Sequence, residues 1–102
     1  MQNNMIREFF LGFIKIHILH HATERPVYGL WLIEELSRHG YQLSPGTLYP
    51  ILHSLEKEKY LKCHQKTIEG KKRKYYKITP KGKKALIETK EKIKELINEI
   101  IT

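Results

Sequence analysis

Hydrophobic residues recur at intervals of three and four along four stretches of the chain, and this period predicts four helices. The predicted helices span residues 4–21, 26–38, 44–59 and a last stretch of about twenty residues from position 79 onward. The first helix is apolar almost all round, so it must be covered on more than one side. Gly40 provides the stop signal of the second helix, while Thr79 and Pro80 provide the cap and the first-turn proline of the last.

The third stretch separates an apolar face from a polar one. Leu48, Ile51, Leu52 and Leu55 stand at i, i+3, i+4 and i+7, as in a helix that packs on a core. The polar side carries small residues, hydroxyls and cations: the expected N-cap Ser44, then Gly46, Thr47, Tyr49, His53 and Lys57. Small residues permit close approach to a major groove and polar groups reach base edges or phosphates, which predicts a DNA-recognition helix. Pro50 removes one helical amide and predicts a tight or bent first turn.

A β-hairpin is predicted between the third and fourth helices. Residues 60–68 and 71–78 flank the dipeptide Glu69-Gly70, in which glycine can supply a positive φ. Tyr76 and Ile78 share the face of the second strand that is expected to pack on the core. The tip carries four consecutive cations, Lys71, Lys72, Arg73 and Lys74. Four like charges repel one another unless a polyanion lies nearby, so the hairpin is interpreted as a DNA-contacting wing. The alternative is an ordinary solvated turn.

The last helix carries a coiled-coil-like stripe. Leu86, Ile93 and Ile100 recur every seven residues, with Leu96 and Ile97 on the same side. Such a stripe, together with the apolar first helix, predicts a homodimer. The predicted interface consists of Phe9, Phe10, Phe13, Leu86, Ile93, Leu96, Ile97 and Ile100. Two-fold symmetry would place two recognition helices about 34 Å apart and predicts a palindromic operator.

Three motifs follow one another along the chain: PVYG at 26–29, GTLYPIL at 46–52 and YYKITPKG at 75–82. Through them the chain resembles the PadR family of transcriptional regulators. The resemblance implies a winged helix-turn-helix domain, a dimer-forming C-terminal helix and a repressor of nearby genes that is released by a small molecule.

Two positions depart from the family pattern. Trp31 stands where the family usually has an acidic residue, and it is interpreted either as ordinary packing or as an aromatic wall for a flat hydrophobic effector. Lys59 replaces the usual glycine at the end of the recognition helix, which predicts a rearranged junction and leaves the orientation of Tyr60 open.

The charge distribution adds to this picture. The 102 residues (12.2 kDa) indicate one domain, mainly α with a small β-hairpin wing, and the net charge is +8. Residues 57–84 hold twelve Lys/Arg and two Glu, so +10 lies there and −2 in the rest. A concentrated basic region indicates a polyanionic partner.

The single cysteine, Cys63, excludes an internal disulfide and fits a cytoplasmic protein with a small core thiol. The apolar run at 9–19 is too short and too polar to span a membrane.

Other candidate chemistry is weak in the sequence. His17, His20 and His21 have a spacing that can bind zinc, but no fourth ligand is evident and the chain has no Asp. These histidines are therefore interpreted as structural or solvated, with metal sensing as the alternative, and no cofactor is expected. Cys63 and His64 alternate across a strand and cannot easily share a metal. No phosphate-binding loop or nucleophile–base pair is recognisable, so the protein is not expected to be an enzyme.

The sequence thus predicts a cytoplasmic, dimeric winged-helix repressor of operator DNA that responds to a small hydrophobic or aromatic effector. A winged-helix module for protein contacts or non-specific nucleic-acid binding is the alternative. Preference for one palindrome over random DNA discriminates between them.

Overall fold

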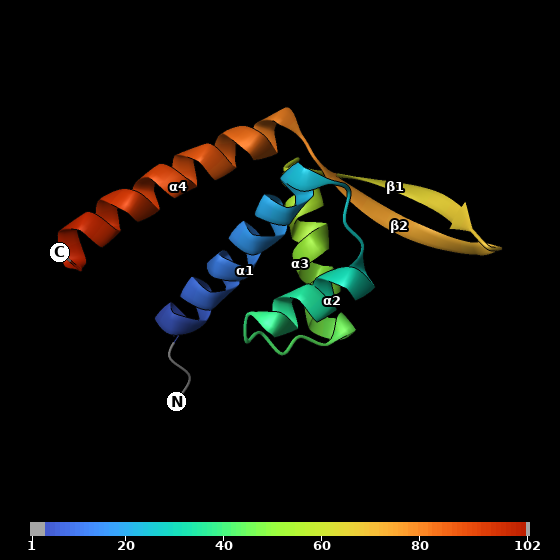
Figure 1. Ribbon diagram of the computed structural model, residues 1–102, viewed down its shortest axis with the longest axis horizontal. Coiled ribbons are helices and arrows are strands. Elements are labelled where there is room, and N and C mark those ends of the chain that lie inside the picture. The colour runs from blue at the N-terminus through green and yellow to red at the C-terminus, as the bar shows by residue number, and fades with distance from the viewer. Residues whose placement is uncertain (1–3, 102) are drawn as a thin grey trace.

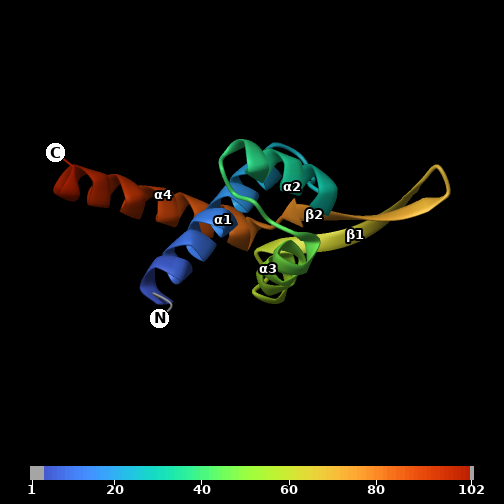
Figure 2. The same cartoon turned by 90° about the horizontal axis from the view of Figure 1, so that it is seen from below.

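The computed structural model describes residues 4–101 and contains four helices and one antiparallel hairpin. In chain order these are α1 (Asn4–Glu24), α2 (Gly29–Arg38), α3 (Pro45–Lys57), β1 (Leu61–Ile68), β2 (Lys71–Ile78) and α4 (Pro80–Ile100). The first three helices form a compact body, from which the hairpin and α4 project in opposite directions (Figures 1 and 2). The predicted fold class is therefore confirmed.

The core lies where the first three helices meet the base of the hairpin. All four residues of the predicted α3 stripe are buried there, in contact with apolar side chains of the neighbouring elements. Those neighbours are Ile18 from α1, Leu32 and Leu36 from α2, Leu61 from β1 and Tyr76 from β2. The polar face of α3 consequently points away from the core, as the helical period predicted.

The predicted start of the second helix at position 26 is wrong, because α2 begins at Gly29. Val27 instead forms an antiparallel bridge with Tyr76, in which each backbone amide donates to the other residue's carbonyl, at 2.9 and 2.7 Å. The backbone hydrogen bonds of this segment are thus satisfied by the hairpin and not by a helical turn. The bridge fixes Tyr28 beside β2.

The predicted stop of the second helix at Gly40 is confirmed. Gly40 has a φ of +90°, and the Tyr41 amide donates a hydrogen bond to the Leu36 carbonyl at 2.9 Å.

The rearranged junction predicted at Lys59 is also wrong. Lys59 adopts the left-handed conformation usual for glycine, with φ +69°, and the Tyr60 amide donates to the Leu55 carbonyl at 2.9 Å. Thr79 stabilises this geometry, since its hydroxyl lies 2.6 Å from the Lys59 carbonyl oxygen and its amide donates to the Tyr60 carbonyl at 3.1 Å. Tyr60 is thereby packed against the core. Tertiary bonds from the start of α4 offset the strain of a left-handed lysine.

We expect Lys59→Gly to raise the free energy of unfolding by up to about 1 kcal/mol, because glycine removes the Cβ clash of the left-handed conformation. Lys59→Ala is the matched control, because alanine also lacks the lysine charge but keeps the Cβ. Thermal unfolding of both variants measures the effect. Equal stabilities of the two variants would show that the lysine backbone is not strained.

The hairpin turn contains two residues with positive φ, Glu69 at +53° and Gly70 at +77°. This is the backbone of the type I′ turn, whose twist matches that of the paired strands. Tyr76 is fully buried and Ile78 packs against the core, as predicted for one face of β2.

The last helix begins on the body of the protein and then leaves it. The Thr79 hydroxyl accepts a hydrogen bond from the Gly82 amide at 3.0 Å, which confirms the predicted cap. A Cβ at Gly82 would lie 2.3 Å from the Tyr60 carbonyl oxygen, so glycine is needed where α4 crosses the junction. Leu86 is only 4% exposed and belongs to the chain's own core. Its predicted place in a subunit interface is therefore wrong, because it has almost no surface left to bury.

Among residues 4–101, no helix is long and apolar enough to cross a membrane.

Candidate nucleic-acid interface

The outer face of α3 is exposed at every predicted position. Ser44 has the extended backbone of an N-cap, but its hydroxyl pairs with the Thr47 hydroxyl at 3.3 Å and makes no capping bond to a described amide. The Thr47 and Leu48 amides both donate to the Ser44 carbonyl, each at 3.0 Å, which gives the tight first turn expected ahead of Pro50. The exposed residues on this face are Ser44, Gly46, Thr47, Tyr49, His53 and Lys57.

A groove of about 480 Å³ joins this face to the hairpin. Tyr49 and His53 line it from α3, and Lys72 and Lys74 line it from β2. The complete lining is Tyr28, Gly29, Leu30, Tyr49, His53, Lys72, Arg73 and Lys74. The described lining contains three cations, two phenol hydroxyls and no carboxylate. Two residue sets that the sequence analysis predicted separately thus meet in one basic groove.

The four cations of the hairpin tip are not equivalent. Lys71, Lys72 and Lys74 are exposed, whereas Arg73 is half-buried with its guanidinium carbon 4.3 Å from the centre of the Tyr28 ring. Tyr28 also makes an edge contact with Tyr75, with ring centres 5.4 Å apart. Stacking on an aromatic face orients a guanidinium at little entropic cost. Arg73 is therefore held in place, while the three lysines extend into solvent.

Residues 28–30 were missed as site residues by the sequence analysis. A Cβ at Gly29 would lie 2.4 Å from the Tyr49 hydroxyl oxygen and 2.7 Å from its ring carbon Cζ. Glycine at this position therefore lets the Tyr49 ring lie against the start of α2, where 37% of Tyr49 remains exposed. The sequence signal was the PVYG motif, which ends at Gly29. Its tyrosine contacts Arg73 and Tyr75 of the hairpin, and its glycine lies against Tyr49 of α3, so the motif joins the two walls of the groove.

The histidines of α1 take different positions. His20 is exposed, while His17 and His21 are partly buried and face α2. Partial burial, followed by the neighbouring His39, lowers the pKa of His17 below its usual 6.5, so this side chain is neutral at pH 7. Trp31 is half-buried against the core, with its ring centre 5.3 Å from that of His21. These contacts are those of ordinary packing, and an effector-binding role for Trp31 stays a prediction.

An exposed polar helix beside a basic hairpin, both resting on a three-helix core, defines a winged-helix protein of the nucleic-acid-binding type. The sequence model of the transcriptional regulator PadR-like family matches residues 18–88, and the chain belongs to this family. It is 47% identical over 96 residues to the transcriptional regulator Rv3488 of Mycobacterium tuberculosis, covering 94% of this chain and 90% of that protein.

Solved structures agree with this assignment. A PadR-like transcription factor from Bacteroides fragilis superposes with a TM-score of 0.85 at 29% identity, covering 96% of each chain. A PadR family transcriptional regulator from Eggerthella lenta gives a TM-score of 0.81 at 29% identity, covering 95% of this chain and 86% of that one. The protein is therefore a winged-helix transcriptional regulator of the PadR family.

Proposed function

We propose that this regulator is a homodimeric repressor that binds a palindromic operator and releases it when a small molecule binds. The observation that carries the proposal is the groove in which Tyr49 and His53 of α3 face Lys72 and Lys74 of β2. With the exposed face of α3 in a major groove, the lysines of the hairpin would reach the adjacent phosphates. The proposed activity is binding without catalysis.

Contacts to the bases are proposed to come from α3, and contacts to the phosphates mainly from the hairpin. Gly46 leaves the start of α3 open. Apart from its chain neighbours and the backbone of its own helix, only the Ser44 hydroxyl oxygen, at 3.8 Å, lies within 4 Å of its ideal Cβ position among the described residues. The paired hydroxyls of Ser44 and Thr47 are available for a phosphate or a base edge at that end. The hairpin cations, in contrast, carry charge without base-specific geometry. Specificity is therefore proposed for α3 and salt-dependent affinity for the hairpin.

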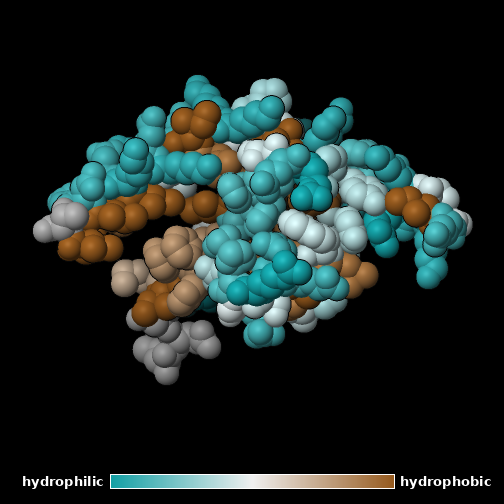
Figure 3. Space-filling model, viewed as in Figure 1, coloured by the Kyte–Doolittle hydropathy of each residue, from teal (hydrophilic) through white to brown (hydrophobic). Residues whose placement is uncertain are grey.

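An open apolar groove between α1 and α4 is the observation that supports the proposed dimer. This groove has a volume of about 310 Å³ and is lined by Phe9, Phe13, Ile93, Leu96, Ile97, Ile100 and Ile101. Figure 3 shows the hydrophobic stripe on α4 facing the hydrophobic end of α1 across a hollow. Phe10 is about half exposed beside it. A second copy of the chain related by a two-fold axis would cover both stripes and place two α3 helices on one DNA duplex.

Release by an effector is the part of the proposal that rests on family membership. Trp31 is the candidate wall for a small hydrophobic or aromatic ligand, since its ring is only partly covered and Arg25 lies 6.0 Å from the ring centre. Quenching of the single tryptophan on titration with planar aromatic compounds would support this role. The same compounds should then lower the affinity for operator DNA.

Selection from a random DNA library tests the proposed DNA binding directly. A regulator of this kind should enrich one palindromic motif and prefer it over random DNA by about 4 kcal/mol or more. The competing function is a winged-helix module for protein contacts or non-specific nucleic-acid binding, for which the basic hairpin is the supporting observation. Enrichment of no motif, together with tight binding to all DNA, would favour that function.

We expect Tyr49→Ala to weaken operator binding by about 1–3 kcal/mol without unfolding the protein, because it removes one side chain from the groove. Gly29→Ala should reproduce part of this loss, since the new Cβ would displace the Tyr49 ring. Tyr49→Phe is the matched control that keeps the ring and removes only the hydroxyl. Binding isotherms and thermal unfolding are measured together. A large loss of stability with normal binding by the folded fraction would assign Tyr49 to packing instead.

A further inference from the structure

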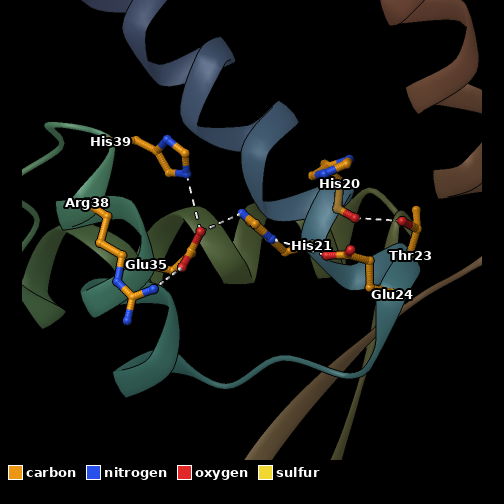
Figure 4. Close-up of polar contacts among 7 residues, drawn as sticks. All are labelled: His20, His21, Thr23, Glu24, Glu35, Arg38 and His39. Atoms are coloured by element: carbon orange, nitrogen blue, oxygen red, sulfur yellow. Dashed lines mark hydrogen bonds and ion pairs between the residues drawn. The ribbon is translucent and has the colours of Figure 1, made fainter.

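Side chains from α1 and from the C-terminal end of α2 bring four potential metal ligands together. His17 and His21 lie one turn apart on α1, and Glu35 and His39 lie one turn apart on and just after α2. One ring nitrogen from each of the three histidines lies within 4.8 Å of the other two. The Glu35 Oε2 atom lies 3.2 Å from His39 Nε2 and 3.5 Å from His21 Nε2. Figure 4 shows the carboxylate between these two imidazoles.

The two separations from Glu35 are close to those within a tetrahedral coordination shell. Bonds of about 2.0–2.1 Å to zinc place neighbouring ligand atoms about 3.4 Å apart. Glu35 already stands at that spacing from His39 and His21. The histidine nitrogens, at 4.8 Å or less from one another, need only small side-chain rotations to reach it.

The surroundings of His21 orient one of its nitrogens toward this centre. Its Nδ1 atom lies 3.5 Å from the Glu24 carboxylate, which would accept the Nδ1 proton when Nε2 binds a metal ion. Among the described residues, the buried Nε2 atom has an ion-pair neighbour in Glu35 but no hydrogen bond of good geometry. A carboxylate behind a metal-binding imidazole is the usual outer-shell arrangement in zinc proteins. Arg38 similarly approaches the other Glu35 oxygen, Oε1, at 3.6 Å.

We propose that His17, His21, Glu35 and His39 form a binding site for one divalent transition-metal ion per chain, of the zinc type. Three imidazoles and one carboxylate suit borderline cations such as Zn²⁺ and Co²⁺, whereas Ca²⁺ and Mg²⁺ take oxygen ligands. The spacing of the α1 histidines in the sequence indicates no fourth ligand. The other two ligands are Glu35 on α2 and His39 just after it, and His39 follows His21 by eighteen positions in the sequence.

A second group, His20, His21 and Glu24, lies close to the first and shares His21 with it. It has three members, two of them exposed, and it would use Glu24 as a ligand instead of as an outer-shell partner. The four-residue site is more enclosed and has ligands from two elements. An ion bound there would tie α1, which bears the open apolar groove, to α2, which borders the basic groove.

Metal binding is tested on the full chain after removal of bound metal with a chelator. Titration with Co²⁺ should give the visible absorption of a tetrahedral cobalt complex, saturating at one ion per chain, and Zn²⁺ should displace it. Trp31, the single tryptophan, lies 5.3 Å from the His21 ring, so Co²⁺ should also quench its fluorescence. An octahedral spectrum, or weak binding of several ions without quenching, would overturn the proposed site.

Point variants locate the ion. His39→Ala changes a half-exposed side chain just after α2 and should lower Co²⁺ affinity by more than about 100-fold, since loss of an outer-shell partner alone costs about 10–100-fold. Glu24→Gln should show that smaller loss of about 10-fold. His53→Ala, on the outer face of α3, is the control and should bind like the wild type. Loss of binding in His20→Ala with full binding in His39→Ala would assign the ion to the second group and overturn the proposal. These measurements contain no DNA, so they succeed or fail independently of the proposed repressor function.

Discussion

Replacing Lys71, Lys72, Arg73 and Lys74 with alanine is expected to weaken binding to every DNA sequence and to flatten its dependence on salt. The slope of log K against log salt concentration is negative, and each lost phosphate contact should reduce its magnitude by about 0.9. The relative preference for the operator over random DNA should change little, because the face of α3 proposed to read the bases is intact. Fluorescence anisotropy at several salt concentrations measures both quantities.

The structure refines this experiment into two smaller ones. The double variant Lys72→Ala/Lys74→Ala removes two exposed charges that line the basic groove and should reduce the magnitude of the slope by about 1.8. Lys90→Ala with Lys94→Ala removes two exposed charges from α4 and is the matched control for net charge. Arg73→Ala alone should also perturb Tyr28, on which the guanidinium stacks. An unchanged salt slope in the Lys72/Lys74 variant would show that the hairpin does not contact DNA.

If the proposed dimer forms through α4, removal of residues 91–102 is expected to abolish it and with it the preference for a palindrome over a half-site. The truncation deletes the α4 lining of the apolar groove, whose large aliphatic side chains contribute roughly 1.5–3 kcal/mol each when buried. Leu86 remains, so the core of the truncated chain is preserved. Half-site binding should survive, because α3 and the hairpin precede the cut. Analytical sedimentation measures the assembly state.

A point variant makes the same test without shortening the helix. Ile97→Glu places a carboxylate in the apolar groove, whereas Ile87→Glu places one on α4 at a position that is 61% exposed and does not line the groove. Only the first should dissociate the dimer. If the truncated chain sediments as a clean dimer with full operator affinity, the assignment of α4 to the interface is wrong. The dimer would then have to rest on α1.

Local patterns in the sequence determined most of the secondary structure of this protein and the charge of its hairpin. The apolar period placed the four buried residues of α3 and left Tyr49 and His53 outside, because a helix repeats every 3.6 residues whatever surrounds it. The dipeptide Glu69-Gly70 located the hairpin turn, and Thr79 located the start of α4, because turns and caps depend on the conformational preferences of a few adjacent residues. The run of cations at the hairpin tip was likewise readable as a charge pattern.

Only the tertiary structure decided which distant residues share a surface. Leu86 follows the same heptad as Ile93, yet it is buried by its own chain, because α4 touches the body only over its first turns. His39 joins His21 because α2 packs beside α1, and Val27 leaves its expected helix because β2 offers its backbone a partner. Periodicity reports which side of an element is apolar, but not what will cover it. That choice depends on contacts between residues far apart in the sequence, whose free energies no local pattern contains.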